Sequence, residues 1–124
     1  MNQSFNNGPS SKNAALERGR QAEQQAEAYL IRQGLKLICR NFRCRYGELD
    51  LVMLDRQTLV IVEVRLRRNS RYGSALESIT LNKQALIIAA TQVYLANQAL
   101  DRAVRFDVVT FDEQGKLHWL ANAF

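Results

Sequence analysis

Alternating apolar and polar residues predict a tight two-stranded hairpin in the middle of the chain. Residues 47–54 and 59–66 each have the pattern of a strand, and residues 55–58 between them are typical of a turn. A hairpin centred on residues 56 and 57 places four pairs opposite one another: Leu54 with Leu59, Val52 with Ile61, Asp50 with Glu63, and Glu48 with Arg65. The other face is then wholly apolar, made of Leu49, Leu51 and Met53 against Val60, Val62 and Val64.

Helical and strand patterns flank this hairpin. Apolar residues at three- and four-residue steps predict a helix over 12–33, ended by Gly34, with a buried face of Ala15, Ala22, Ala26, Tyr29 and Leu30. A second helix, capped by Thr80 or Ser78, should run to about Asn97 and carry an apolar face of Leu81, Ala85, Ile88, Ala89, Gln92 and Leu95.

Three further strands complete the predicted fold. They cover residues 35–43, where Leu35, Leu37 and Cys39 alternate with polar residues, then 104–111, and 117–123 after a turn at 114–115. A long helix between strands implies a crossover connection. The chain is therefore expected to be an α/β protein of order α-β-β-β-α-β-β, with a mixed sheet flanked by helices.

Composition narrows the class of protein. The 124 residues suit one domain, expected over 14–124, and the polar segment 1–13 is expected to be a disordered tail. No apolar run approaches the roughly 20 residues of a membrane span, and the first residues do not resemble a signal peptide. The two cysteines, Cys39 and Cys44, form no disulfide framework and lack zinc-site spacing, which favours a reduced cytoplasmic protein.

Asp50 and Glu63 are the residues most in need of a chemical explanation. Both carboxylates lie within otherwise apolar strands, and directly opposed like charges destabilise a sheet. A carboxylate removed from water is costly unless it is paired, hydrogen-bonded or bound to a metal. Oxygen ligands of this kind favour Mg²⁺ or Mn²⁺. The alternative is an ordinary core hairpin with solvated charged ends, in which Glu48 and Arg65 form a cross-strand ion pair.

Basic residues gather on both sides of the hairpin. Arg40, Arg43 and Arg45 precede it, and Arg65, Arg67, Arg68 and Arg71 follow it, so that both groups are expected at the end that carries the carboxylates. Tyr46 and Tyr72 are interleaved with them and are candidates for stacking on bases or sugars. The net charge of +5 also favours a polyanionic partner. This pattern suits phosphate contacts of nucleic acid, and a solvated charged surface is the alternative.

The acidic residues of the hairpin, taken together with residues along the rest of the chain, resemble a known family. Asp50, followed one short hairpin later by Glu63, Val64 and Arg65, resembles the PD-(D/E)xK signature of restriction-endonuclease-like phosphodiesterases. From about Ala15 to Phe124 the chain also resembles the small YraN family, which is related to Holliday-junction resolvases. The residues that carry this resemblance are 19–23, 26, 29–30, 34, 41, 43–45, 47–51, 62–64, 73, 83–84, 105–109 and 122–124.

The resemblance implies a restriction-endonuclease-like fold and a set of roles. Asp50 and Glu63 would be the metal ligands, with the carbonyl of Val64 as a further one, and Glu23 would be the acidic residue that the first helix brings to the site. Lys83 and Gln84, in the first turn of the second helix, would contact a phosphate. A solvated position on a helix is the alternative for each of these last three residues.

Arg65 departs from the family pattern, which has lysine at this position. A guanidinium is always protonated and cannot act as a base, but it can bind the scissile phosphate. The leading hypothesis is therefore a nucleic-acid-binding protein that acts as a Mg²⁺-dependent, structure-directed DNA endonuclease. The rivals are a non-catalytic nucleic-acid-binding module and a protein-interaction scaffold. The expected partner is nucleic acid, with branched DNA, DNA ends, single strands and RNA all left open as substrates. Symmetric cutting of two strands would call for a homodimer.

Overall fold

The computed structural model describes residues 11–67, 79–99 and 101–124. It confirms the predicted α/β class and the order α-β-β-β-α-β-β. The elements, in chain order, are α1 Ser11–Arg32, β1 Lys36–Cys44, β2 Gly47–Asp55, β3 Thr58–Leu66, α2 Leu81–Gln98, β4 Val104–Phe111 and β5 Leu117–Leu120. Residues 1–10 of the expected tail, and the predicted contacts of Arg68, Arg71 and Tyr72, lie outside the described residues. No helix in the described ranges is long and apolar enough to cross a membrane.

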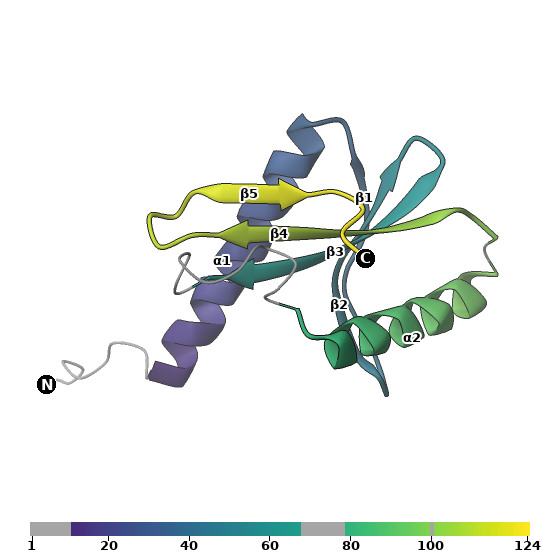
Figure 1. The fold of residues 1–124 in the computed structure, drawn as a ribbon, viewed down its shortest axis with the longest axis horizontal. Helices are drawn as coiled ribbons and strands as arrows, with labels where there is room; N and C mark the ends of the chain where they lie inside the picture. The colour runs from purple at the N-terminus through teal and green to yellow at the C-terminus, as the bar shows by residue number, and fades with distance from the viewer. Residues whose placement is uncertain (1–10, 68–78, 100) are drawn as a thin grey trace, which may run out of the picture.

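The five strands form one mixed sheet in the order β1-β2-β3-β4-β5 (Figure 1). Strands β3 and β4 are parallel, and the other neighbouring pairs are antiparallel. Helix α2 connects the two parallel strands, as the crossover prediction requires. The segment order along the chain thus produces the mixed sheet that the sequence indicated.

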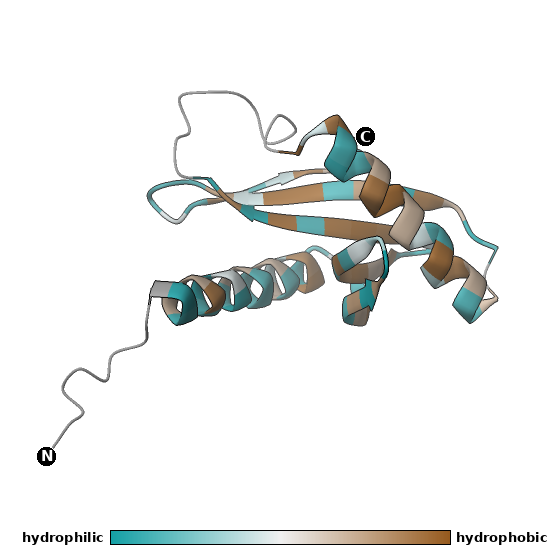
Figure 2. Cartoon of the chain, turned by 90° about the horizontal axis from the view of Figure 1, so that it is seen from below, coloured by the Kyte–Doolittle hydropathy of each residue, from teal (hydrophilic) through white to brown (hydrophobic). Residues whose placement is uncertain are grey.

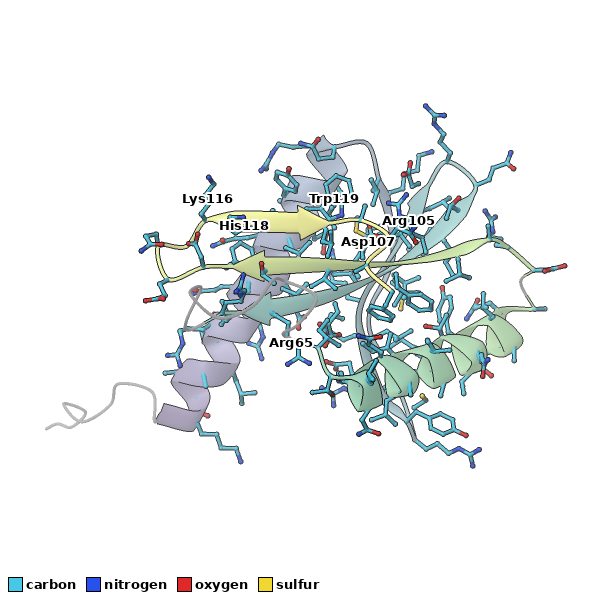
Figure 3. The ribbon with its side chains drawn as sticks, in the orientation of Figure 1. Arg65, Arg105, Asp107, Lys116, His118 and Trp119 are labelled. Atoms are coloured by element: carbon cyan, nitrogen blue, oxygen red, sulfur yellow. The ribbon has the colours of Figure 1, made fainter. Side chains whose placement is uncertain are left out.

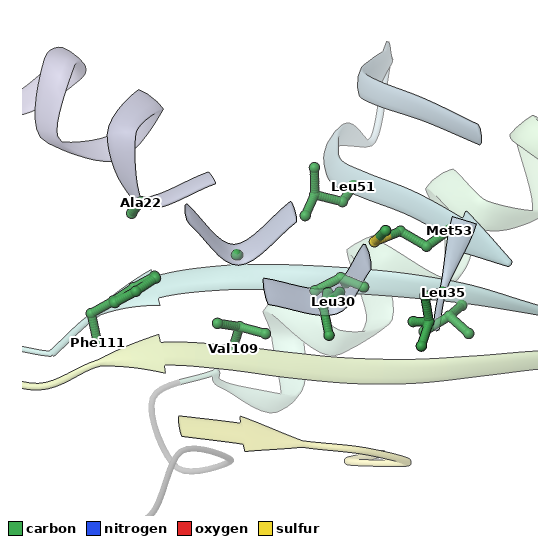
Figure 4. Close-up of a cluster of buried hydrophobic side chains, with 10 residues drawn as sticks. Ala22, Leu30, Leu35, Leu51, Met53, Val109 and Phe111 are labelled. Atoms are coloured by element: carbon green, nitrogen blue, oxygen red, sulfur yellow. The ribbon is translucent and has the colours of Figure 1, made fainter. Parts of the chain in front are cut away.

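Helix α1 covers one face of the sheet with small and aliphatic side chains. Ala22, Ala26 and Leu30 are buried against a cluster that includes Met53 and Phe111 (Figure 4). Gly34 then ends the helix with φ of +103°, a conformation that glycine adopts without steric cost. The predicted inner face of the helix is confirmed from Ala22 to Leu30, while Ala15 is exposed.

Helix α2 packs on the opposite face, but with a different side from the predicted one. It buries Ile87, Ala90, Thr91 and Tyr94, whereas Leu81 on the predicted face is 82% exposed. Hydrophobic and hydrophilic segments alternate along the ribbon of this helix (Figure 2), and aliphatic residues lie on more than one side of it. Periodicity alone therefore did not identify the buried side of the helix. Tyr94 lies on that side, and its ring packs edge-on against the ring of Phe42, with the two ring centroids 5.2 Å apart.

The central hairpin has the predicted register near its turn. Its ladder runs from Asp55 opposite Thr58 to Leu51 opposite Val62, and it ends there among the described residues. Beyond that point β2 stays paired with β1 as far as Gly47, and β3 stays paired with β4 as far as Leu66. The two strands diverge into separate arms (Figure 1). The predicted ladder pairs of Asp50 with Glu63 and of Glu48 with Arg65 are therefore wrong.

Two of the predicted side-chain directions also change. Leu49 packs with the α2 cluster, although Leu51 and Met53 pack with the α1 cluster. In β1, an irregularity between Leu37 and Cys39 sends these two residues to opposite faces of the sheet. Strict alternation fails at both places because the strand locally changes its pairing.

Candidate active site

The cleft at which β2 and β3 separate brings together the sequence-predicted acidic residues. It has a volume of about 300 Å³ and lies between α1, β2, β3 and the start of α2. Its lining residues are Gly19, Ala22, Glu23, Asp50, Glu63, Val64, Arg65, Leu66 and Lys83. All four predicted catalytic residues therefore line one cleft, although they come from three different elements.

The side chain of Asp50 connects β2 to β3 just beyond the end of their ladder. Its Oδ2 accepts a hydrogen bond from the backbone N–H of Val64 at 2.8 Å. Its carboxyl group is also hydrogen-bonded to that of Glu63, which is only 6% exposed. The two carboxyl groups are thus neighbours across the cleft even though their backbones are not paired.

Burial changes the acidity of this pair. It raises the pKa of Asp50 to about 8, and the nearby charge of Glu63 adds to the rise. Burial also raises the pKa of Glu63, while Lys83 and then Arg65 oppose the rise. The Glu23 pKa is raised too, first by burial and then by Asp50 and Glu48. Near neutral pH the Asp50–Glu63 pair therefore retains a proton, and a cation would favour its release.

Two cationic side chains face Glu63. Arg65 Nε lies 3.3 Å from Glu63 Oε2, and Lys83 Nζ lies 3.9 Å from the same oxygen. Arg65 Nε is buried and makes no hydrogen bond within the described part of the chain, so its contact with Glu63 is electrostatic. Figure 3 shows Arg65 on the arm of β3 that borders the cleft. Both cations are within reach of an anion that enters beside the carboxylates.

Glu48 has a different partner from the predicted one. Its Oε2 accepts a hydrogen bond from Arg43 Nε at 2.8 Å, and Arg65 pairs with Glu63 instead. One carboxylate oxygen from each of Glu23, Glu48 and Asp50 lies within 4.8 Å of the other two. Because the arms of β2 and β3 diverge, Glu48 turns toward Glu23 on the first helix.

The geometry of these three carboxylates is compatible with a divalent cation. At the usual Mg²⁺–oxygen distance of about 2.1 Å, neighbouring ligand oxygens are about 3.0 Å apart and opposite ones about 4.2 Å, so the three carboxylate oxygens, which lie within 4.8 Å of one another, would have to move closer together to share one ion. A hydrogen-bond donor orients each carboxylate: Val64 for Asp50, Arg43 for Glu48, and Asn41 for Glu23, at 2.9 Å from Nδ2 to Oε1. Glu63, a predicted ligand, is outside this group of three but adjoins it through Asp50.

Asn41 is a site residue whose role the sequence did not reveal. It has a positive φ of 53° in β1 and donates to Glu23 across 18 positions of sequence. An asparagine within a predicted strand was the available signal, because asparagine adopts a positive φ more readily than most residues do.

Among the described residues that were predicted to contact phosphate, Arg65 and Lys83 line the cleft and the others do not. Arg45 lies at the tip of the β1–β2 arm, where its guanidinium stacks 4.8 Å above the ring of Tyr46 and donates to the Tyr46 hydroxyl at 2.7 Å. Arg67 follows the end of β3, on the other arm. The side chain of Gln84 donates to the carbonyl of Ile79 at 3.2 Å and so closes the first turn of α2.

Comparison with known proteins gives the family. The pattern of the family described as "Uncharacterised protein family UPF0102" matches residues 22–111. The chain belongs to the UPF0102 family. Among its relatives, a UPF0102 protein of Pseudomonas paraeruginosa is 48% identical over an alignment 115 residues long, and the match covers 87% of this chain and 92% of the relative. A UPF0102 protein of Nitrosococcus oceani is 50% identical over an alignment 113 residues long, and the match covers 87% of this chain and 91% of the relative.

The UPF0102 match includes the charged residues of the cleft. The matched range includes Glu23, Asp50, Glu63, Arg65 and Lys83, together with the donor Asn41. The family description names no activity, so an activity for this UPF0102 protein has to be inferred from the chemistry of the cleft.

Proposed function

We propose that this UPF0102 protein binds nucleic acid and hydrolyses its phosphodiester bonds with the help of Mg²⁺ or Mn²⁺. The observation that carries the proposal is the cleft in which Asp50 and Glu63, with raised pKa values, lie beside Arg65 and Lys83. Carboxylates and cations together in one cleft suit a substrate that brings both a metal ion and a phosphate. The resemblance to the PD-(D/E)xK enzymes supports the same assignment.

Each side chain then has a defined task. Asp50 and Glu63 hold the ion, and Glu23 and Glu48 are placed to contribute further oxygens. Held there, a divalent ion would supply Lewis acidity for activating water and for stabilising the charge that develops at phosphorus. Arg65 and Lys83 hold the scissile phosphate, and the guanidinium of Arg65 stabilises the added negative charge in the transition state.

Arg65 also supports a second candidate, a nucleic-acid-binding module without catalysis. A lysine can lose its proton when it is buried and can then assist the attacking water, whereas arginine cannot. The cleft would in that case hold a cation and a phosphate without cleaving the strand. The two candidates share the same ligands and differ in whether the product of cleavage forms.

Replacing Asp50 by asparagine tests the proposal. The amide side chain of the Asp50→Asn variant would keep the shape of the carboxylate and an oxygen to accept from Val64, but it removes the charge that holds the cation. In calorimetry we expect Mg²⁺ or Mn²⁺ to bind wild-type protein and to bind Asp50→Asn at least 10-fold more weakly. Wild type should cleave labelled branched or linear DNA, and the variant should lose this cleavage.

The matched control is Asp101→Asn, which makes the same chemical change at an exposed residue outside the cleft. It should bind metal and cleave DNA as wild type does. Metal-dependent DNA binding without cleavage of any substrate would favour the module. The proposal is wrong if no metal binds to wild type even in the presence of DNA.

A further inference from the structure

A second hollow runs along α1 on the other side of Glu23 from the acidic cleft. It is an open groove of about 700 Å³ between α1 and β1, and Glu23 lines both the groove and the cleft. The two hollows are therefore neighbours along one helix. A polymer held at the cleft would meet this groove next.

Three arginines border the groove. Arg20 and Arg32 come from α1, and Arg40 comes from the facing strand β1. Arg40 donates two hydrogen bonds to Glu27, at 2.6 and 2.9 Å, which fix its guanidinium and neutralise that carboxylate. Arg20 is 68% exposed and only 3.6 Å from Glu17, while Arg32 lies 5.9 Å above the ring of Tyr29. Exposed guanidinium groups of this kind suit phosphate oxygens.

Between the arginines, apolar side chains line part of the groove and polar ones the rest. Ala28 and Ile31 line it, and Ile31 is 46% exposed although it lies next to Arg32 on a charged helix. The faces of unpaired bases are apolar and pack on such surfaces, whereas the bases of a duplex are stacked inside it. Arginines at the rim and aliphatic side chains between them therefore match a single strand better than a duplex.

The dimensions agree with a short stretch of strand. From Arg20 to Arg32 the helix rises by about 18 Å, which is the length of roughly five nucleotides at the phosphate spacing of a helical strand and of fewer when the strand is extended.

We propose that the groove between α1 and β1 binds the unpaired strand of a nucleic acid whose scissile phosphate lies in the acidic cleft. This inference rests on the proposed function and deepens it, because it restricts the substrates to those with a single-stranded segment beside the cut. Glu23 marks the point at which the strand passes from the groove to the carboxylates.

The test measures binding without metal, with EDTA present, so that it is separate from cleavage. The double variant Arg20→Ala and Arg32→Ala removes two rim charges and leaves Arg40 in place, because Glu27 depends on it. We expect its affinity for a labelled deoxythymidine oligonucleotide to fall about 10-fold or more. The slope of log affinity against log salt should fall by about 1.4, since each phosphate contact to a single strand contributes about 0.7.

The matched control is Lys12→Ala with Arg18→Ala, which removes two positive charges from the same helix but not from the groove. This control should weaken single-strand binding by less than about 3-fold. Neither double variant should change the affinity for a blunt duplex by more than about 3-fold. Equal losses in both double variants, or an equal loss of duplex binding, would mean that only net charge matters and would overturn the inference.

A second variant tests the apolar wall independently of charge. Ile31→Ser should weaken single-strand binding several-fold without changing the salt slope, and Leu16→Ser, at a residue 59% exposed on the same helix, should not. Equal binding by both serine variants contradicts the groove assignment. If wild type binds no nucleic acid, the proposed function fails together with the groove; if wild type binds and cleaves but the groove variants behave as wild type, only the groove fails.

Discussion

Asp107→Ala should lower the free energy of unfolding by about 3–5 kcal/mol, the usual cost of breaking a buried ion pair from one side. The carboxylate of Asp107 has no exposed surface and accepts four hydrogen bonds. Oδ1 accepts from Arg105 Nε and from the backbone N–H of Asn122, both at 2.9 Å. Oδ2 accepts from Arg105 Nη2 at 3.0 Å and from Trp119 Nε1 at 2.9 Å.

This carboxylate joins parts of the fold that are distant in sequence. Arg105 also donates to Asp55 at 2.9 Å, so the network connects β4 with the end of β2 and with the last residues of the chain (Figure 3). Without Asp107, the guanidinium of Arg105, which is only 22% exposed, would keep one partner, and the indole N–H of Trp119 would lose the acceptor that it has here. Orphaned buried donors cost about 1–3 kcal/mol each, which is why the expected effect is large.

Urea denaturation followed by circular dichroism measures the change. Asp101→Ala is the control, because it removes a carboxylate from an exposed residue and should change the stability by no more than about 0.5 kcal/mol. A loss below about 1 kcal/mol for Asp107→Ala would show that the four hydrogen bonds contribute little beyond what water offers the same groups.

The sequence predicted the local features of the fold well. Strict alternation and a short turn determine the register of a hairpin, so the pairing from Asp55 to Leu51 followed from the pattern alone. The bounds of β4 agree with the predicted 104–111, because a short apolar run bounded by polar segments marks a buried strand. Asp50 and Glu63 stood out because charged residues are rare inside apolar strands, and the structure places both in one cleft.

The features that depend on contacts between distant segments were not predictable in this way. The divergence of β2 and β3 after Leu51 depends on their separate partners, β1 and β4, and it moved Glu48 away from Arg65 toward Glu23. The buried side of α2 was likewise decided by the sheet it covers. Asp107 carried no local signal, because its donors come from residues 105, 119 and 122, which meet only in the folded chain.

The raised pKa of Asp50 makes stability depend on pH in a defined direction. An unfolded aspartate has a pKa near 3.9, whereas burial and Glu63 raise the folded value to about 8. Between these values the folded protein retains a proton that the unfolded chain has lost. This contribution to stability is fully present below about pH 4, decreases as the pH rises and is lost above about pH 8. Asp50→Asn, which carries no charge at any pH, should therefore melt at a higher temperature than wild type at pH 9.

A cation bound at the cleft should reverse this loss, because it replaces the proton between the carboxylates. At a fixed Mg²⁺ concentration a hundredfold above the dissociation constant at pH 9, we expect the ion to add about 2.7 kcal/mol of stability to wild type at pH 9 and less at pH 6, where protons compete for the carboxylates. The melting temperature should therefore rise more at pH 9 than at pH 6. At pH 7 each ion should displace about one proton, measurable by calorimetry in two buffers of different ionisation enthalpy. Asp50→Asn should lose both effects and Asp101→Asn neither. A Mg²⁺ effect that is the same at pH 6 and pH 9 would place the ion away from Asp50, since only ligands that titrate in this range couple its binding to pH.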